Sequence, residues 1–256
     1  FMAELERLLE RKRVVFLRNG NRIRCFPHII NIIVKTGLRD LTSIDLESDP
    51  EVMQDDIFEL LGDSACNLPT EIDDEYLHAL QADVIGLVRK LVAALRASHS
   101  RREALKEVIE QGNKEGWFDK EIPVVTLLRD VDTRWSSIFL MADRVYILYP
   151  AIKIMLRREE YKDLRHHLLT PIQLRVLSDI RGFLRIFHAA QQVVSADKTP
   201  TLSTVIPIYE QLKGMLEDAC FSYPNIKHAI FASLNKLREY VAKAQSTPIY
   251  QLSMCM

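Results

Sequence analysis

The sequence lacks the features that mark secreted and membrane proteins. Its four cysteines, Cys25, Cys66, Cys220 and Cys255, are scattered and form no close pair, so free thiols in a reducing intracellular compartment are expected. No apolar run approaches the roughly 18 residues of a membrane span, and no secretory signal is present. We therefore expect no membrane partner.

Glycine and several enzyme motifs are scarce or missing as well. Eight glycines fall well below the usual share of roughly 7 per cent, and most of the ten prolines stand where a helix could begin, so the composition favours helices. No Gly-rich phosphate loop, Gly-x-Ser-x-Gly elbow or His-Glu-x-x-His motif occurs. Those enzyme classes are excluded, and no small-molecule substrate is evident.

The net charge of −1 results from acidic and basic residues that are unevenly distributed along the chain. Between Arg39 and Glu75 there are thirteen acidic residues and one basic residue, a net of −12, so the rest of the chain carries +11. A basic folded body attracts polyanions, whereas an acidic run with few aromatics is typical of a solvated linker. The alternative, that the acidic run merely keeps the protein soluble, stays open.

The first 37 residues predict mixed structure. Apolar residues from Met2 to Leu9 recur at helical spacing and indicate a short amphipathic helix. Asn19-Gly20 between two apolar runs is typical of a hairpin and predicts two short strands. Pro27 and Gly37 then bracket an isoleucine-rich helix, with Gly37 as a left-handed cap, although this run also fits a buried strand.

Residues 38–74 lack sustained periodicity and are predicted to be an acidic flexible linker. Helical patterns follow to the end of the chain. The first predicted helix has about five turns over 77–95, and the second is capped by the box Ser100–Glu103 and ended by Gly112. An extended run over 122–128 follows, then a helix capped by Thr133 and a helix started by Pro150. The last three predicted helices are a long helix opened by the capping box Thr170–Gln173 and two helices over 205–216 and 226–241.

Cys25 and His28 have half the spacing of a zinc site. A structural zinc needs four ligands, and no second Cys/His pair stands at usable spacing, so a zinc site is disfavoured. From the residues alone, Cys25 is better read as a small buried hydrophobe and His28 as a donor near a helix start.

Arg134 and Trp135 stand side by side and could bind unpaired DNA, because a guanidinium clamps phosphate and an indole stacks on a base. Taken alone, Trp135 fits a core anchor better. Arg22 and Arg24 belong to a basic cluster around the predicted hairpin, which fits either DNA phosphates or a solvated face. Asp130 and Asp132 could share a cation on an extended segment, but we interpret them as acids at a helix start.

In this order, the Cys-x-x-His-x-x-Asn stretch at 25–31 and the Thr-Arg-Trp stretch at 133–135 resemble the hobo/Ac/Tam3 (hAT) superfamily of DNA transposases. Residues 107–118, 143–152, 169–171 and 198–203 are similar to fungal-type members. The resemblance implies a mainly α chain, with a small α/β remnant of an RNase H-like fold over 1–37 and an all-α helical insertion domain over 75–256.

The resemblance also implies roles for single residues. Cys25 and His28 would support an acidic, Mg²⁺-dependent catalytic centre, and Trp135 with Arg134 would hold a flipped base during excision. In the family, two catalytic Asp positions precede the segment matching residue 1 and the Glu follows the insertion, so the chain is expected to be catalytically incomplete. DNA at transposon ends is the implied partner and the nucleus the implied location, with homo-oligomerisation open.

Three functions compete on this basis. The first is a DNA-binding, inactive transposase fragment. The second is a helical scaffold that binds protein partners and no DNA. The third is an autonomous metal-dependent nuclease that uses Asp130, Asp132 and His28.

Overall fold

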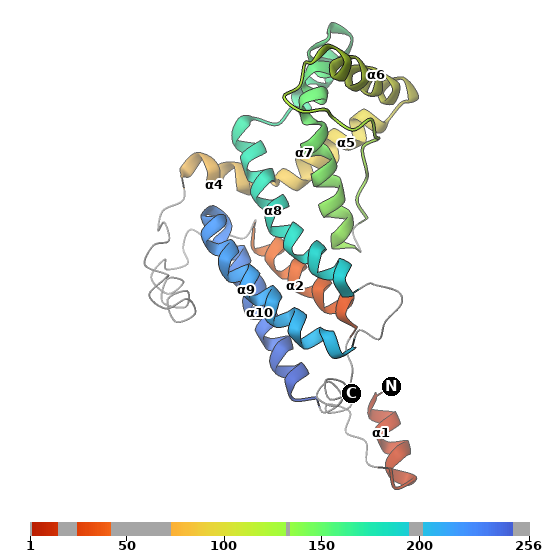
Figure 1. Ribbon diagram of the computed structural model, residues 1–256, viewed down its shortest axis with the longest axis vertical. Coiled ribbons are helices and arrows are strands. Elements are labelled where there is room, and N and C mark those ends of the chain that lie inside the picture. Colours follow the sequence, from red (N-terminus) through yellow and green to blue (C-terminus); the bar gives the residue numbers. More distant parts are fainter. Residues whose placement is uncertain (1, 15–24, 42–72, 132–133, 195–201, 248–256) are drawn as a thin grey trace. The chain divides into compact units, whose positions relative to one another are not determined.

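The computed structural model describes residues 2–14, 25–41, 73–131, 134–194 and 202–247. Every regular element in these ranges is a helix (Figure 1), which confirms a mainly helical fold. The expected strands around Asn19-Gly20 lie outside the described residues, so the RNase H-like remnant stays an expectation. Within the same ranges, no helix combines the length and apolarity that a bilayer crossing requires.

The α-helices are α1 (Met2–Arg11), α2 (Phe26–Asp40), α4 (Asp74–Gln81), α5 (Val84–Arg96), α6 (His99–Glu115), α7 (Trp135–Arg157), α8 (Pro171–Val194), α9 (Val205–Ser222) and α10 (Lys227–Gln245). The 3-10 helices within the described ranges are η2 (Glu159–His167), η3 (Leu202–Thr204) and η4 (Pro224–Ile226).

Contacts divide the chain into two compact units, and each is described by itself. The first unit contains residues 1–40, 48–68 and 186–256, and the second contains residues 41–47 and 69–185. The division falls within α8, after Arg185. The domain limits that the sequence predicts at residues 37 and 74 stay a prediction.

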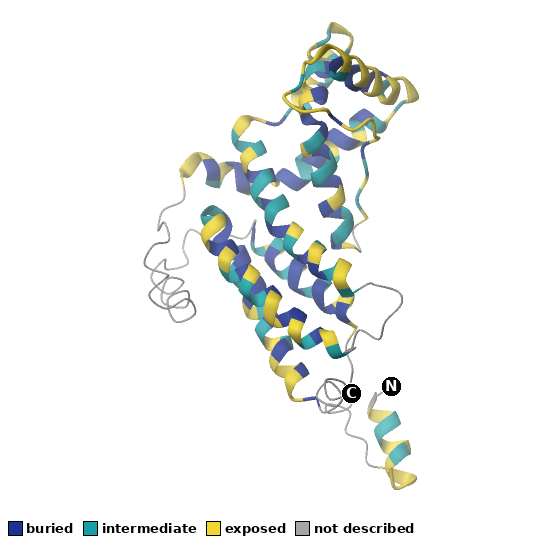
Figure 2. Cartoon of the chain, in the orientation of Figure 1, coloured by how far each residue is buried: buried dark blue, intermediate teal, exposed yellow. Residues whose placement is uncertain are grey.

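In the first unit, α10 packs against both α2 and α9. The buried face of α2 follows helical spacing, as the dark residues in Figure 2 show, and contains Phe26, Ile29, Ile30, Ile33, Val34 and Gly37. The Phe26 ring stacks on Tyr209 of α9 at a centroid distance of 5.2 Å. The hydroxyl of Ser233 in α10 donates to the Ile33 carbonyl at 3.1 Å, so a polar group inside this core is satisfied.

Gly37 does not end α2, contrary to the sequence prediction. The helix continues to Asp40, and Gly37 is buried at the next position of the apolar face. Among the described glycines, only Gly116 has a positive φ. Burial therefore decides the role of Gly37: a residue without a side chain continues the face that packs in the core instead of adopting a left-handed cap.

In the second unit, the long helix predicted over 77–95 is broken. Asp83 has a φ of 50° and separates α4 from α5, and its carboxylate accepts from the Gly86 amide at 3.0 Å. Hydrophobic spacing continues across the break, which is why periodicity alone did not reveal it. An aspartate that tolerates the left-handed region and caps the following amides can start a new helix there.

The limits of α6 also differ from the prediction. Ser98, not Ser100, is the N-cap, and its hydroxyl accepts from the Arg101 amide at 3.2 Å. The helix passes Gly112, which is buried, and ends at Gly116 in the left-handed conformation. A Cβ atom at Gly112 would come within 2.3 Å of the Phe118 ring, so this glycine serves close packing rather than termination.

The helix predicted to start at Pro150 is part of α7, which runs through it without a break. Its neighbours Leu148, Tyr149, Ala151 and Ile152 are all buried, so packing outweighs the hydrogen bond that proline cannot donate. The capping box that opens α8 is confirmed. The Thr170 amide donates to Gln173 Oε1 at 2.9 Å, and the Gln173 amide donates to Thr170 Oγ1 at 3.3 Å.

Asp83→Ala is predicted to lower the free energy of unfolding of the second unit by about 1–3 kcal/mol. The substitution removes the cap of α5 and places alanine in the left-handed region. Asp83→Asn is the matched control and should change stability by less than about 0.5 kcal/mol, because asparagine caps and tolerates this conformation. Urea unfolding measures both, and equal losses for the two variants would contradict the capping role.

His228 is predicted to make the first unit sensitive to acid. Burial lowers its pKa from 6.5 to about 4, and its Nε2 atom is buried without a hydrogen-bond partner. Because the folded pKa is lowered, stability is present above the unfolded pKa and is lost as the pH falls towards 4. Relative to His228→Gln, the wild type should lose about 2–3 kcal/mol of unfolding free energy between neutral pH and pH about 4. Parallel pH profiles in urea unfolding would contradict this.

Candidate nucleic-acid interface

Trp135 lies in the core and not on the surface. It is the first residue of α7, and only 2% of its surface is exposed. Arg134 is the exposed N-cap, in an extended conformation with no side-chain cap hydrogen bond. In this conformation the indole cannot stack on a base, so that role for Trp135 requires its displacement from the core and stays a prediction.

The turn before Trp135 is held by Ser137. The Val131 amide donates to Ser137 Oγ at 2.8 Å, and this hydroxyl donates to the Arg134 carbonyl at 2.6 Å. The Arg134 amide also donates to the Val131 carbonyl at 2.9 Å. These bonds fix where the helix begins and hold the Trp135 backbone in place. Thr133, the predicted cap, lies outside the described residues.

Asp130 forms an ion pair with Arg89. Arg89 Nε lies 2.7 Å from Asp130 Oδ2, and the carboxylate is 11% exposed. Asp132 lies outside the described residues. No group of three or more His, Cys, Asp or Glu side chains that could hold a metal ion occurs in the ranges that the structure describes. The described residues therefore do not fit the Mg²⁺ centre of a nuclease.

Cys25 and His28 are both exposed at the start of α2. The Cys25 carbonyl accepts from the amides of His28 and Ile29, each at 3.1 Å, so this residue starts the helix through its backbone. The expectation that Cys25 is buried is wrong, because its side chain precedes the apolar face of α2. Arg22 and Arg24 lie outside the described residues, and their predicted contact with DNA stays a prediction.

A basic region that the sequence analysis did not single out lies where α5, α6 and η2 meet. Between Val84 and Lys106 there are six basic residues and one acidic residue, which is the signal that could have revealed it. The structure brings Lys90 of α5 and Arg101 of α6 close to His167 of η2, whose neighbour is His166. We call these four residues the basic junction.

The pKa of His167 reflects the charges of the basic junction. Burial lowers its pKa below the ordinary value, and the positive charges of His166, Lys90 and Arg101 lower it further. The two histidine rings lie 4.0 Å apart between centroids. Lys90 and His166 are exposed, and Arg101 and His167 are half-buried, so solvent reaches all four side chains.

Hydrogen bonds to helix ends position this cluster. Arg101 donates to the Ala94 carbonyl at 2.8 Å, which ties the start of α6 to the end of α5. Arg165 donates to the carbonyls of Leu156 at 3.1 Å and Arg157 at 2.9 Å, which ties η2 to the last turn of α7. The carbonyls at these helix ends gain cationic donors, and the basic side chains gain fixed positions.

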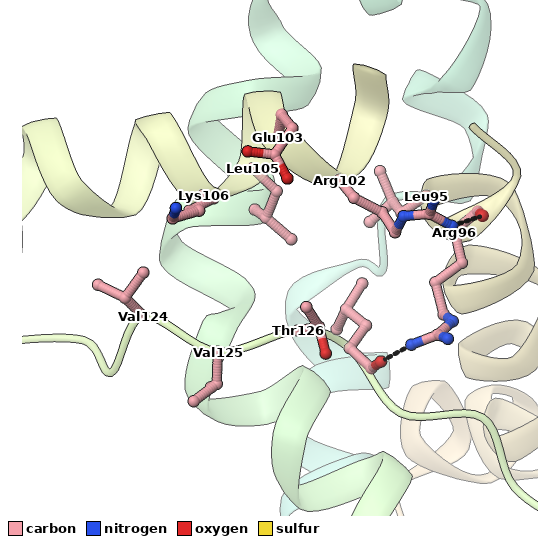
Figure 3. A pocket seen from close by; sticks show the side chains of 10 residues that line it. Leu95, Arg96, Arg102, Glu103, Leu105, Lys106, Val124, Val125 and Thr126 are labelled. Carbon is pink, nitrogen blue, oxygen red and sulfur yellow. Dashed lines mark hydrogen bonds between the residues drawn. The ribbon is translucent and has the colours of Figure 1, made fainter. Parts of the chain in front are cut away.

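An apolar hollow lies beside this region (Figure 3). Its volume is about 270 Å³, and its lining includes the apolar Leu95 and Leu105 and the charged Arg102, Glu103 and Lys106. The irregular segment 117–131 passes along it and corresponds to the predicted extended run. Side chains anchor the backbone of this segment: Asn113 bonds both backbone groups of Ile122, Arg96 donates to the Leu127 carbonyl, and Arg144 donates to the Thr126 carbonyl.

A comparison with protein families finds a match within the helical part of the chain. Residues 65–183 match the family model of the ZBED1 RNase-like helical domain. The match supports a hAT-like, transposase-related helical domain, and it does not extend to the RNase H core that the resemblance implies for residues 1–37. It includes the whole basic junction. No match was found among the curated proteins or the solved structures.

Lys90→Gln is predicted to raise the pKa of His167 towards its ordinary value, because the substitution removes a nearby like charge and leaves the burial in place. Lys106→Gln on the same region of α6 is the control and should leave this pKa unchanged. Titration of the histidine ring protons by NMR measures it. A pKa that does not respond to Lys90→Gln would show that the charges do not act together.

Proposed function

We propose that the second unit binds DNA through the basic junction, as a helical domain of the hAT-like, transposase-related kind, in a nuclear protein. The observation that carries the proposal is the convergence of Lys90, Arg101, His166 and His167 inside the segment that matches the family model. Cationic side chains brought together from three helices suit a phosphate backbone, which carries closely spaced negative charges.

The chemistry of this interface follows from its residue types. Lys90 and Arg101 are cationic side chains that would neutralise phosphates while releasing counterions. His167 has a lowered pKa, so it gains charge at a lower pH than an ordinary histidine. Binding should therefore weaken steeply with salt and tighten as the pH falls below the ordinary pKa of a histidine. Strand cleavage with Mg²⁺ remains what the resemblance implies for a complete relative.

A protein-binding scaffold is the second candidate, and the apolar hollow beside α5 and α6 favours it. Apolar floors with a polar rim are common at protein contacts. The hollow is small, and Arg102 and Lys106 in its lining outnumber the acidic Glu103, which also fits a surface that faces DNA. The two candidates differ in one property: the scaffold needs no salt-dependent retention of DNA.

Neutralising the basic junction is predicted to weaken DNA binding and its salt dependence together. Each of Lys90→Gln and Arg101→Gln should reduce the slope of log affinity against log salt by about 1, if each residue contacts one phosphate. Lys213→Gln on α9, in the first unit, is the control and should leave the slope unchanged. Fluorescence anisotropy with a short duplex over a salt series measures all three.

Two results would contradict the proposal in different ways. If the wild type retains no DNA even at low salt, the scaffold function is favoured. If it retains DNA but neither substitution changes the slope, the phosphate contacts lie elsewhere on the chain.

A further inference from the structure

We infer that the apolar hollow beside α5 and α6 binds a short acidic peptide that carries one large apolar side chain. The hollow has a volume of about 270 Å³, and all of its lining residues belong to the second unit. The lining comes from α5, α6 and the irregular segment 117–131. The inference names the partner of a protein-binding scaffold and does not depend on the proposed contact with DNA, because no residue of the basic junction lines the hollow.

The size and lining of the hollow suit a single bulky apolar side chain. Small-molecule sites usually have volumes of roughly 300–1,000 Å³, so the hollow is too small to enclose a whole cofactor. Leu95 and Leu105 are buried in its lining, and Val124 is 44% exposed. In Figure 3, the Val124 side chain points towards the side where Leu105 and Lys106 of α6 lie, whereas Val125 points the opposite way. An apolar side chain beside Val124 and Leu105 would remove apolar surface of both partners from water.

Basic side chains accompany this apolar lining and favour a ligand with carboxylates. The charged residues of the lining are three bases and one acid, namely Arg96, Arg102, Lys106 and Glu103. The Arg102 guanidinium donates to the Arg96 carbonyl at 3.1 Å, which holds it at the end of α5. Arg96 itself donates to the Leu127 carbonyl, and its Nε atom is buried without a hydrogen-bond partner among the described residues. A half-buried guanidinium with an unpaired donor is stabilised when an anion binds nearby.

Unpaired backbone groups in the lining favour a peptide over a small organic acid. Arginine side chains already donate to the carbonyls of Thr126 and Leu127. The carbonyls of Val124 and Val125 and the Thr126 amide, in contrast, bond to no other described residue. These three residues are exposed, so the groups remain for water or for the backbone of a ligand. A peptide can bond to them along its main chain while a side chain enters the hollow, as in other cases of peptide recognition by an irregular or extended segment.

Duplex DNA suits the hollow less well than an acidic peptide does. A phosphate backbone would use the basic side chains and leave the apolar lining in water. A phenylalanine with acidic residues on both sides uses both features at once, because the ring enters the hollow and the carboxylates face the cations. The combination of charge and apolar surface therefore favours a protein partner at the hollow and leaves phosphate contacts to the basic junction.

The test measures the binding of three labelled peptides to the whole chain by fluorescence anisotropy. The reference peptide is Glu-Asp-Glu-Phe-Glu-Asp-Glu with blocked ends. In the second peptide alanine replaces the phenylalanine, and in the third glutamine and asparagine replace the acids. The chain should bind the reference about 10- to 100-fold more tightly than the alanine peptide, as expected for the burial of one large apolar side chain. The neutral peptide should also bind more weakly, with less dependence on salt.

Substitutions in the chain test the same contacts. Val124→Asp should lower the affinity for the reference peptide about 10-fold or more, because it removes an exposed apolar contact and adds a charge that repels acids. Arg102→Gln should lower this affinity about 2- to 5-fold. Lys114→Gln removes a positive charge from α6 outside the hollow, so it is the matched control and should leave the affinity unchanged. Circular dichroism verifies that each variant is folded.

The remaining outcomes separate this inference from its alternatives. If the phenylalanine and alanine peptides bind equally, the hollow only attracts negative charge and the inference is wrong. If Val124→Asp weakens the binding of duplex DNA and not of the peptide, the hollow faces DNA and the inference is overturned. A dimer that Val124→Asp dissociates, measured by light scattering, would assign the hollow to a second copy instead. If the chain binds the reference peptide and no DNA, the inference stands and the proposed function fails; the reverse result overturns the inference alone.

Discussion

Apolar packing beneath the surface of the second unit holds like charges together. Helix α5 buries Val84, Ile85, Val88, Leu91, Val92 and Leu95, and it packs against both α6 and α7. Lys90 and Arg101 are carried by these helices, and Arg165 fixes the histidines of η2 to the end of α7. Charges that repel one another stay close only because the elements carrying them are stabilised elsewhere. A surface built this way is ready to accept an anion, which relieves the repulsion.

The helical character of the chain could be predicted from its sequence, because periodic burial and capping are local signals. The capping box of α8 is the clearest case: Thr170 and Gln173 bond to each other's amides as the residue types require. Breaks and continuations were harder to predict. Asp83 interrupts a periodic pattern and Pro150 does not, because the outcome depends on burial on both sides of each residue, and a linear pattern does not contain that information.

The candidate site shows a similar limit. The Thr-Arg-Trp stretch pointed to residues 133–135, but Trp135 proved to be a core residue, as bulky aromatics in helices usually are. The basic junction could not be predicted as a unit, since Lys90 and His167 are far apart in the sequence and meet only through packing. In the sequence, the basic junction was indicated by the excess of basic residues between Val84 and Lys106. Likewise, Tyr146 of α7 and Asp179 of α8 are distant in the sequence and line one pocket only through packing.

In the proposed function, the cations of the basic junction would provide affinity for the DNA backbone. The central claim is that phosphates lie against the histidines of η2. The most direct measurement is the pKa of His167 by NMR with and without saturating duplex DNA. We expect DNA to raise this pKa, because a nearby phosphate stabilises the imidazolium. A pKa unchanged by bound DNA would show that phosphates do not lie against these histidines.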